Sequence, residues 1–428
     1  MDKEWFFDNL KKLLAAMRKI SAGTVLWIWA LTMIAGIFIY KLIKTDKPEK
    51  EVTLTFATWW DDELEGETLS VLAAEYEKQN PGITIRLEKM NWEKIQELVE
   101  KKDTKDAGKN VQKVYPPDIF SIDPYAIYEL EKKSILAELE NSKDFSGNVV
   151  SIISFINPLY YNIDLLENAG FDRPPKNQTE FLSYVQRLKE TGIFGAGLSL
   201  NDPRSTSQQL LSWIWAATGN PDSSSSFRFD SKEVIDTLNF LNLLNQNLYA
   251  NPFDLSKADL REAFGKGKIG MMIGSVADIK ELKRSQINFS ITTIPSPVSY
   301  TKKPVFPLSV WYAGINSRSE HQKEAKDFIL FLKKNSDKIA AAAYAVPGSG
   351  TLNRELSKED PYYAKAFDMY EAGEMVRELY RSPNITQLNS IITREVRLMF
   401  QGSKTPQECA AAIQRSWENL TETTTSVQ

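Results

Sequence analysis

Clustered tryptophans are the residues of this sequence whose chemistry is easiest to interpret. The chain has ten tryptophans, and five of them fall in three short clusters, Trp59-Trp60, Trp213-x-Trp215 and Trp311-Tyr312. An indole ring covers the apolar C–H face of a sugar, while Asp, Asn and Arg side chains bond the hydroxyls at its rim. The clusters therefore indicate carbohydrate binding, and packing in the core is the alternative for one member of each.

Carboxylates near these clusters keep an enzymatic alternative open. Asp61, Asp62 and Glu63 follow the first predicted strand, and Asp123 follows the third. Both loops could lie at the carboxyl edge of a parallel sheet, and a glycosidase needs two carboxylates about 5–9 Å apart. A glycan-acting enzyme is therefore the alternative to a binding protein, although 56 acidic side chains offer many accidental pairs.

The chain has very few of the histidine and cysteine residues that other catalytic sites and metal sites use. It has one histidine, His321, and one cysteine, Cys409. A histidine metal centre, a Ser/His/Asp triad and an intrachain disulfide all need more than that. These three kinds of site are therefore not expected, and we predict no metal and no cofactor. A binding protein without catalytic residues, which is not an enzyme, is the prediction, and the glycan-acting enzyme stays its alternative.

One glycine motif matches a dinucleotide-binding pattern by its letters. Gly265, Gly267 and Gly270 have the spacing G-x-G-x-x-G. A dinucleotide site needs a strand before this motif and a helix after it, whereas here a predicted helix precedes it and a predicted strand follows. The glycines instead predict a left-handed helix cap and a tight turn into the strand.

The hydrophobic pattern around these residues predicts an α/β domain. Residues 52–58 alternate as a strand, 69–80 form an amphipathic helix stopped by Pro81 and Gly82, and 83–87 alternate again. Strand, helix and strand at this spacing predict a parallel sheet. A third strand is expected at 118–122 and later ones near 269–273 and 289–294. Helices are expected at 177–190, 207–218, 231–247 and 257–264, and in most of the C-terminal third.

The N-terminal segment differs from the rest in charge and hydropathy. The 428 residues carry a net charge of −4, but residues 1–50 carry +4 and the remainder −8. Ile20–Tyr40 is a run of 21 residues without a formal charge, about 31 Å long as a helix and so close to the thickness of a bilayer core. This predicts one transmembrane anchor, and the acidic remainder makes a nucleic-acid partner unlikely on charge grounds.

The flanks of the apolar run indicate that it is not cleaved. About twenty residues precede it, no small-x-small pair follows it, and no cysteine is placed for lipid attachment. Trp5, Leu13 and Met17 fall at helical spacing, so 1–19 is predicted as an amphipathic cytoplasmic segment. Residues 41–51 are predicted as a polar linker.

Several segments in order resemble the extracellular solute-binding protein family 1 of ABC importers, which includes the maltose-binding proteins. They are VTLTFATWW, YEKQNPGITIRL, PPDIFSID, PLYYNIDLLENAGFDRPPKNQTEFL, AFGKGKIGMMIGS, SVWYAGINSRSEHQKEAKDFILFL, AVPGSG and PNITQLNSI, spread over about residues 52–415. The resemblance implies a two-lobed periplasmic-binding-protein-like fold (type II), with solute held in a cleft that closes by a hinge. It implies an N-terminal lobe of 52–158 and 288–325 and a C-terminal lobe of 159–287 and 326–420.

The resemblance also implies which residues contact the solute. It implies ligand contacts at Trp60 and Asp61 after the first strand, at Asp123 after the third, and at Tyr161. It further implies Trp213 or Trp215 on a helix and Trp311 on a returning strand. Together with the clusters read from the sequence, the predicted ligand-binding residues are Trp59, Trp60, Asp61, Asp123, Tyr161, Trp213, Trp215, Trp311 and Tyr312.

The family's role implies the location and the partners. An importer's receptor faces outward, so we expect a single-pass protein of the cell (inner) membrane with residues 52–428 extracytoplasmic, periplasmic or extracellular. The expected partners are a small-molecule solute, most simply an oligosaccharide, and the permease subunits of an ABC importer. A glycan-sensing or adhesion protein on the same fold is a third interpretation.

Overall fold

The computed structural model describes most of the chain from residue 51 onward. The described residues are 29, 31–36, 51–60, 64, 67–101, 116–139, 147–219, 227–297, 304–347, 354–376 and 384–425. They belong to two compact units, one of residues 1–52 and 80–84 and a much larger one of residues 53–79 and 85–428. The cleft and the candidate site belong to the larger unit, as do the lobes apart from Val52 and residues 80–84.

The predicted membrane segment 20–40 lies largely outside the described residues. Its described part, Trp29 and residues 31–36, is helical. Among the residues that the structure describes, no helix is long and apolar enough to cross a membrane. The predicted segment 1–19 lies wholly outside the described residues, and of the linker 41–51 only Glu51 is described.

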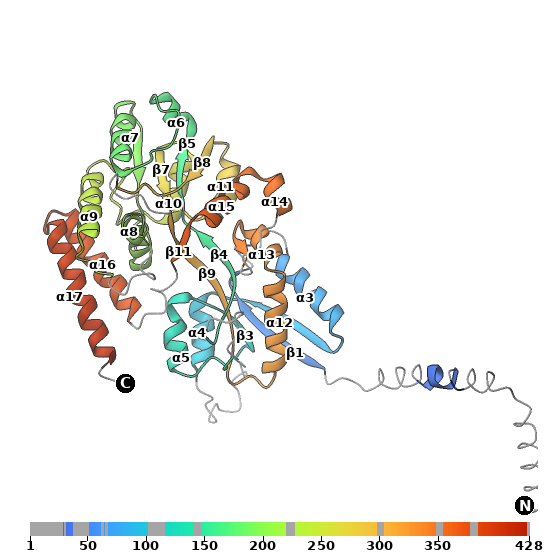
Figure 1. Ribbon diagram of the computed structural model, residues 1–428. Coiled ribbons are helices and arrows are strands. Elements are labelled where there is room, and N and C mark those ends of the chain that lie inside the picture. Colours follow the sequence, from blue (N-terminus) through green and yellow to red (C-terminus); the bar gives the residue numbers. More distant parts are fainter. Residues whose placement is uncertain are drawn as a thin grey trace, which may run out of the picture. The chain divides into compact units, whose positions relative to one another are not determined.

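The first lobe is built on a sheet of seven strands (Figure 1). In order across the sheet they are β10 (Val346–Pro347), β4 (Val150–Ile156), β9 (Val305–Ile315), β3 (Ile119–Ile122), β1 (Val52–Thr58) and β2 (Ile83–Lys89), with β11 (Glu374–Val376) paired to β9. β1 and β3 are parallel, as predicted, but the sheet as a whole is mixed, because β10 pairs antiparallel with β4. β9 runs antiparallel to both β3 and β4 and so joins the two halves of the sheet.

Helices with apolar faces pack on this sheet. They are α3 (Thr68–Gln79), α4 (Trp92–Glu100), the 3-10 turn η2 (Pro124–Ala126), α5 (Ile127–Lys132), α12 (Gln322–Lys334) and α13 (Ser336–Ala343). Phe328 of α12 meets Phe56 of β1 with ring centroids 6.3 Å apart and Tyr76 of α3 at 5.0 Å. These edge-on contacts fix α3 and α12 over the sheet.

The second lobe is built on a four-stranded sheet. The strand order is β6 (Phe194–Gly197), β7 (Ile269–Ile273), β5 (Leu159–Asn162) and β8 (Phe289–Thr292), with β6 parallel to β7 and β5 antiparallel to both of its neighbours. Its helices and 3-10 turns are α6 (Ile163–Asn168), α7 (Gln178–Glu190), α8 (Pro203–Thr218), α9 (Lys232–Asn245), α10 (Lys257–Gly265), η4 (Val276–Asp278), α11 (Ile279–Leu282), η5 (Lys283–Ser285), α14 (Arg354–Glu359), α15 (Pro361–Ala372), α16 (Ile385–Phe400) and α17 (Pro406–Thr425).

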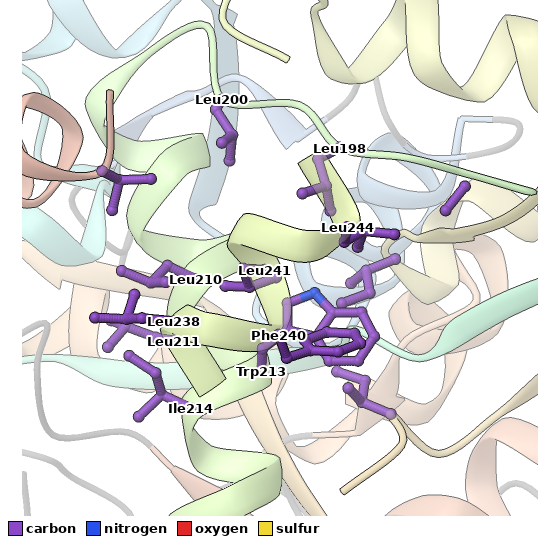
Figure 2. Packing of buried hydrophobic residues seen from close by; sticks show 14 of the residues in the cluster. Leu198, Leu200, Leu210, Leu211, Trp213, Ile214, Leu238, Phe240, Leu241 and Leu244 are labelled. Carbon is purple, nitrogen blue, oxygen red and sulfur yellow. The ribbon is translucent and has the colours of Figure 1, made fainter. Parts of the chain in front are cut away.

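The core of the second lobe lies between α8 and α9. Figure 2 shows Trp213 beside Phe240, and their ring centroids are 4.9 Å apart. Leu210 and Ile214 of α8 belong to the same cluster, and all four side chains are buried. Burying aliphatic and aromatic side chains of this size is the main favourable term in folding the lobe.

The glycine motif forms a helix cap and a turn into a strand, as predicted. α10 ends at Gly265 and β7 begins at Ile269. Gly267 has a φ of 66°, and the amides of Gly267 and Lys268 donate to Phe264 and Ala263 at 2.9 and 3.0 Å. The left-handed residue therefore ends the helix and turns the chain into the strand.

Sheet membership refines the predicted division into lobes. β8 belongs to the second sheet although 288–325 was assigned to the N-terminal lobe, whereas α12, α13 and β10 pack on the first sheet although 326–420 was assigned to the C-terminal lobe. Antiparallel pairing of β8 with β5, and of β10 with β4, accounts for both differences. By sheet membership we propose a first lobe of 53–79, 85–156, 305–347 and 374–376 and a second lobe of 159–292, 354–372 and 384–420.

A buried carboxylate joins elements of the two proposed lobes. The Oδ2 atom of Asp360 accepts hydrogen bonds from Lys283 Nζ at 2.8 Å and from Tyr344 Oη at 2.7 Å. Tyr344 ends α13, whereas Lys283 begins η5 and Asp360 caps α15. Burial acts to raise the pKa of Asp360, but the bonds from Lys283 and Tyr344 outweigh it, so this pKa lies below its ordinary value.

We expect Asp360→Asn to lower the free energy of unfolding by about 1–3 kcal/mol at pH 7, because it removes a charged hydrogen-bond acceptor. A carboxyl whose pKa is depressed by folding stabilises the protein above its unfolded pKa of about 4. That contribution is lost as the pH falls through the folded-state pKa. Urea titrations from pH 7 to pH 3 should therefore show the difference between wild type and variant shrinking below about pH 4.

Asp368→Asn is the matched control, since Asp368 is an exposed residue of the same helix. It should leave the free energy of unfolding within about 0.5 kcal/mol of wild type. A constant difference between wild type and Asp360→Asn across the whole pH range would contradict the assignment.

Candidate ligand-binding cleft

Residues of both lobes line a cleft of about 920 Å³. The first lobe contributes an aromatic wall from five different elements. Trp59 follows β1, Trp92 begins α4, Tyr125 lies in η2, Phe155 in β4 and Trp311 in β9. Trp59 and Trp92 are half-buried and meet edge to face with centroids 6.0 Å apart. The carboxyl ends of β1 and β3 lead to this wall, as expected for the ligand edge of an α/β sheet.

A buried indole supports the aromatic wall from behind. Trp60 is fully buried, and its ring stacks on Trp311 with centroids 5.1 Å apart and an angle of 8° between the planes. On its other side Trp60 meets Phe56 edge-on at 5.6 Å. The Trp311 ring is therefore held in one orientation at the cleft by packing alone.

The second lobe contributes a wall rich in charge. Its basic members are Arg204 at the start of α8, Lys257 and Arg261 on α10, Lys280 on α11 and Arg284 in η5. Its acidic members are Asp278 and Glu281, and Arg261 pairs with both, at 2.8 and 2.6 Å. Burial raises the pKa of Asp278 despite this ion pair.

Arg204 and Gln208 of the second lobe contact the first wall across the cleft. Arg204 forms an ion pair with Oδ2 of Asp123, and its guanidinium lies 4.7 Å from the centre of the Tyr125 ring. Asp123 Oδ1 accepts a hydrogen bond from the Tyr125 amide at 3.0 Å. Gln208 Nε2 donates to Ser309 Oγ of β9 at 2.9 Å. Both oxygens of Asp123 are thus engaged by the protein.

Two amide side chains at the cleft carry unpaired hydrogen-bonding atoms. Asn157 lies where β4 passes into β5, and Gln209 lies on α8. Asn157 Nδ2 and Gln209 Oε1 are buried and have no partner among the described residues, whereas Gln209 Nε2 donates to the Ile273 carbonyl at 3.2 Å. Buried polar atoms are rarely left unpaired, so each such atom needs an explanation.

The structure brings three of the predicted site residues to this cleft. Trp59, Asp123 and Trp311 line it. Trp60 lies behind the wall and contacts Trp311. Asp61 lies outside the described residues.

The other four predicted residues are not among the residues lining the cleft. Trp213 and Trp215 belong to the core of the second lobe, as does Tyr161, whose ring lies 5.7 Å from Lys365 Nζ. Tyr312 is buried opposite Ile122 of β3. In a strand, neighbouring side chains point to opposite faces, which separates Tyr312 from Trp311.

Several lining residues were missed by the sequence reasoning. Trp92 lies in a helical run of the sequence, a pattern typical of core packing, yet it is the first residue of α4 and borders the cleft. Two of the basic residues carried a usable signal, since Lys257 and Arg261 are four residues apart within the predicted helix 257–264. Residues at that spacing share one face of a helix.

Metal ligands are not gathered in the part of the chain that the structure describes. No group of three or more His, Cys, Asp or Glu side chains there could hold a metal ion. The chemistry of the cleft is that of aromatic faces, amides and charged groups.

Comparison with known proteins agrees with this arrangement. The family model described as bacterial extracellular solute-binding protein matches residues 60–339. The chain belongs to this family. The match covers well over half of the sequence and includes Trp60 after β1, Trp213 and Trp215 near the end of α8, and Trp311 on the returning strand β9.

Relatives of this solute-binding protein are distant in sequence. The sn-glycerol-3-phosphate-binding periplasmic protein UgpB of Shigella dysenteriae is 23% identical over 289 residues, which is 60% of this chain and 63% of the relative. A putative binding protein of Brucella abortus is 23% identical over 371 residues, covering 80% and 85% of the two chains. These relatives carry the names of binding proteins.

Solved structures share the two-lobed fold. The GacH receptor of Streptomyces glaucescens, studied unliganded and with acarbose, superposes with a TM-score of 0.68 at 17% identity, over 87% of this chain and 99% of that one. A solute-binding protein from Thermotoga lettingae bound with α-D-tagatose gives a TM-score of 0.66 at 19% identity, over 87% and 100%. At these identities the likeness concerns the fold.

The different surroundings of the tryptophans predict different effects on stability. Trp213→Ala should lower the free energy of unfolding by about 3–5 kcal/mol, because it opens a cavity between α8 and α9. Trp59→Ala should lower the free energy of unfolding by about 1 kcal/mol or less, since this side chain is half-buried at the cleft. Urea unfolding of the purified full chain in detergent measures both, and equal losses would contradict the division into core and cleft residues.

Proposed function

We propose that this protein is an extracytoplasmic receptor that binds a carbohydrate, most simply an oligosaccharide, in the cleft between its lobes. The observation that carries the proposal is the aromatic wall formed by Trp59, Trp92 and Trp311 opposite a wall of polar and charged side chains. A sugar ring has the same division, with apolar C–H faces and a polar rim.

The unpaired amides support a ligand that carries hydroxyl groups. A hydroxyl both donates and accepts hydrogen bonds. It can therefore satisfy an amide nitrogen such as that of Asn157 and an amide oxygen such as that of Gln209, both unpaired within the described residues. Hydrogen bonds from the ligand to these atoms would recover part of the free-energy cost of burying them, which is about 1–3 kcal/mol for each unpaired atom.

The size of the cleft supports an oligosaccharide. Its volume of about 920 Å³ lies near the upper end of the range of about 300–1,000 Å³ that is usual for small-molecule sites. Similar proteins have names or titles that mention acarbose, α-D-tagatose and sn-glycerol 3-phosphate. Their ligands are polyhydroxylated or phosphorylated small molecules.

Closure of the two lobes would complete the site. Among the described residues, the contacts across the cleft include the polar ones from Arg204 to Asp123 and from Gln208 to Ser309. Polar contacts of this kind can be exchanged for contacts to a ligand at small net cost, which suits a hinge. A bound sugar would add contacts to both walls and so favour the closed form.

We propose further that the receptor serves an ABC importer and is held at the membrane by residues 20–40. A relative in Deinococcus radiodurans, 22% identical over 265 residues, is named a probable ABC transporter-binding protein. An anchor would keep the receptor near the permease and raise its effective concentration there. The uncharged run from Ile20 to Tyr40 supports the anchor by its length.

A hydrolytic role finds less support than binding. In a glycosidase, Asp123 would be the second catalytic carboxylate beside Asp61. Asp123 already accepts a hydrogen bond from the Tyr125 amide and forms an ion pair with Arg204. A glycosidase needs one carboxyl free to donate a proton. Accumulation of sugar product during incubation would reverse this preference.

Binding can be tested with the full chain in detergent and a panel of glycans, read by melting temperature and tryptophan fluorescence. At least one glycan should raise the melting temperature, since a ligand that binds only the folded state stabilises it. Trp92→Ala should weaken binding about tenfold or more, because it removes one face of the aromatic wall.

Trp213→Phe is the control for this experiment. It keeps an aromatic ring in the core between α8 and α9 and should leave the affinity unchanged. A panel that gives no stabilisation at all, or a Trp92→Ala variant that binds as well as wild type, would overturn the carbohydrate proposal.

The anchor has a separate test. Full-length protein should stay with membranes after alkaline carbonate washing, whereas a variant lacking residues 1–45 should be released, because only the former has the apolar run. Protease added to intact spheroplasts should digest residues 52–428. Release of the full-length protein by carbonate, or full protection from protease, would contradict the proposed placement.

A further inference from the structure

The charged side chains of the cleft are sorted by lobe. Among the described residues that line it, the second lobe contributes five basic and two acidic side chains, and the first lobe contributes two acidic ones and no basic one. The basic residues are Arg204, Lys257, Arg261, Lys280 and Arg284. The wall opposite the aromatic rings is therefore net positive.

Most of the acidic groups nearby are already paired with arginines. Arg261 forms ion pairs with both acidic residues of its own wall, Asp278 and Glu281. Arg204 forms an ion pair with Asp123 of the other wall. These pairs leave the carboxylates with little capacity to neutralise a further cation.

Lys257 is bound by a neutral group instead. Its Nζ atom donates to Oε1 of Gln208, and no carboxylate of the described residues forms an ion pair with it. The side chain is exposed to the cleft, yet surrounding protein replaces much of its water and lowers the pKa of Lys257. The charges of Asp202 and Asp278 act to raise this pKa, but desolvation outweighs them, and neither carboxylate forms an ion pair with the ammonium group among the described residues.

Gln208 places this ammonium group next to the aromatic wall. The same amide that accepts from Lys257 donates through Nε2 to Ser309 Oγ at 2.9 Å. Ser309 lies on β9, two residues before Trp311. A ligand that stacks on Trp311 thus has a cation, fixed by a hydrogen-bonded amide, on the opposite wall.

We propose that the solute carries an anionic group, a carboxylate or a phosphate, and that Lys257 binds it. This inference rests on the proposed function and makes its ligand an acidic sugar. The sugar ring would contact the aromatic side chains of the first lobe, and its anionic group would meet the positive wall of the second. A charged hydrogen bond to Lys257 would give its ammonium group a direct ion pair and tie the ligand to both lobes.

Matched pairs of compounds test the proposal on the full chain in detergent. One arm compares galactotriose with trigalacturonic acid, and the other compares glucose with glucose 6-phosphate, so that carboxylate and phosphate are distinguished. In at least one arm the anionic member should bind about tenfold or more tightly than its neutral partner, by calorimetry. This preference should fall as salt is raised from 20 to 500 mM.

Lys257→Gln should remove most of the preference, and Arg284→Gln should reduce it. Lys268→Gln is the matched control, since Lys268 is an exposed lysine just beyond the other end of α10. It should keep the wild-type preference. Melting curves without ligand establish that each variant is folded.

The outcomes separate this inference from the proposed function. In one outcome neutral sugars bind as tightly as their anionic partners, and Trp92→Ala abolishes this binding. That outcome would overturn the inference but would support the carbohydrate receptor. Tight binding of an anion that survives Trp92→Ala but not Lys257→Gln would support the anion site and contradict the aromatic sugar site. No binding of either anionic compound, or a preference that survives Lys257→Gln, would overturn the inference.

Discussion

The pairing of β9 with both β3 and β4 is the interaction on which the rest of this structure depends. β9 crosses the first sheet antiparallel to these two strands, with Ile119–Ile122 on one side and residues 150–156 on the other. Its ladder joins segments almost two hundred residues apart in sequence. It fixes Trp311 at the cleft, where the ring stacks on the buried Trp60. The aromatic wall is thus an extension of the core of the first lobe.

The two walls of the cleft are held by different forces. The aromatic wall is positioned by apolar packing, which acts at contact and changes little with salt or pH. The opposite wall is positioned by ion pairs and charged hydrogen bonds, among them Arg261 with Asp278 and Lys257 with Gln208. A ligand that satisfies both walls must have an apolar face and a polar, charge-bearing part.

Sequence reasoning succeeded where a local pattern had one structural solution. The βαβ unit at 52–89, the strand at 119–122 and the helix cap at Gly267 all follow from periodicity or from the backbone needs of glycine. The tryptophan clusters were informative only in part. Trp59 and Trp311 line the cleft, but Trp213 packs against Phe181 and Phe240. An indole suits a core and a sugar site equally well, so its residue type cannot separate the two.

The sequence by itself determined the α/β class and the resemblance to solute-binding proteins. It also predicted that the aromatic residues after β1 lie at the ligand edge of the sheet. These depend on patterns within short segments. Only the tertiary structure decided which side of each strand faces the cleft, that Trp92 joins Trp59, and that Asp123 is paired with Arg204. It alone brought Lys257 and Gln208 together with Ser309. Such contacts join residues far apart in the chain, and their geometry is set by how the sheets and helices pack, which no local pattern encodes.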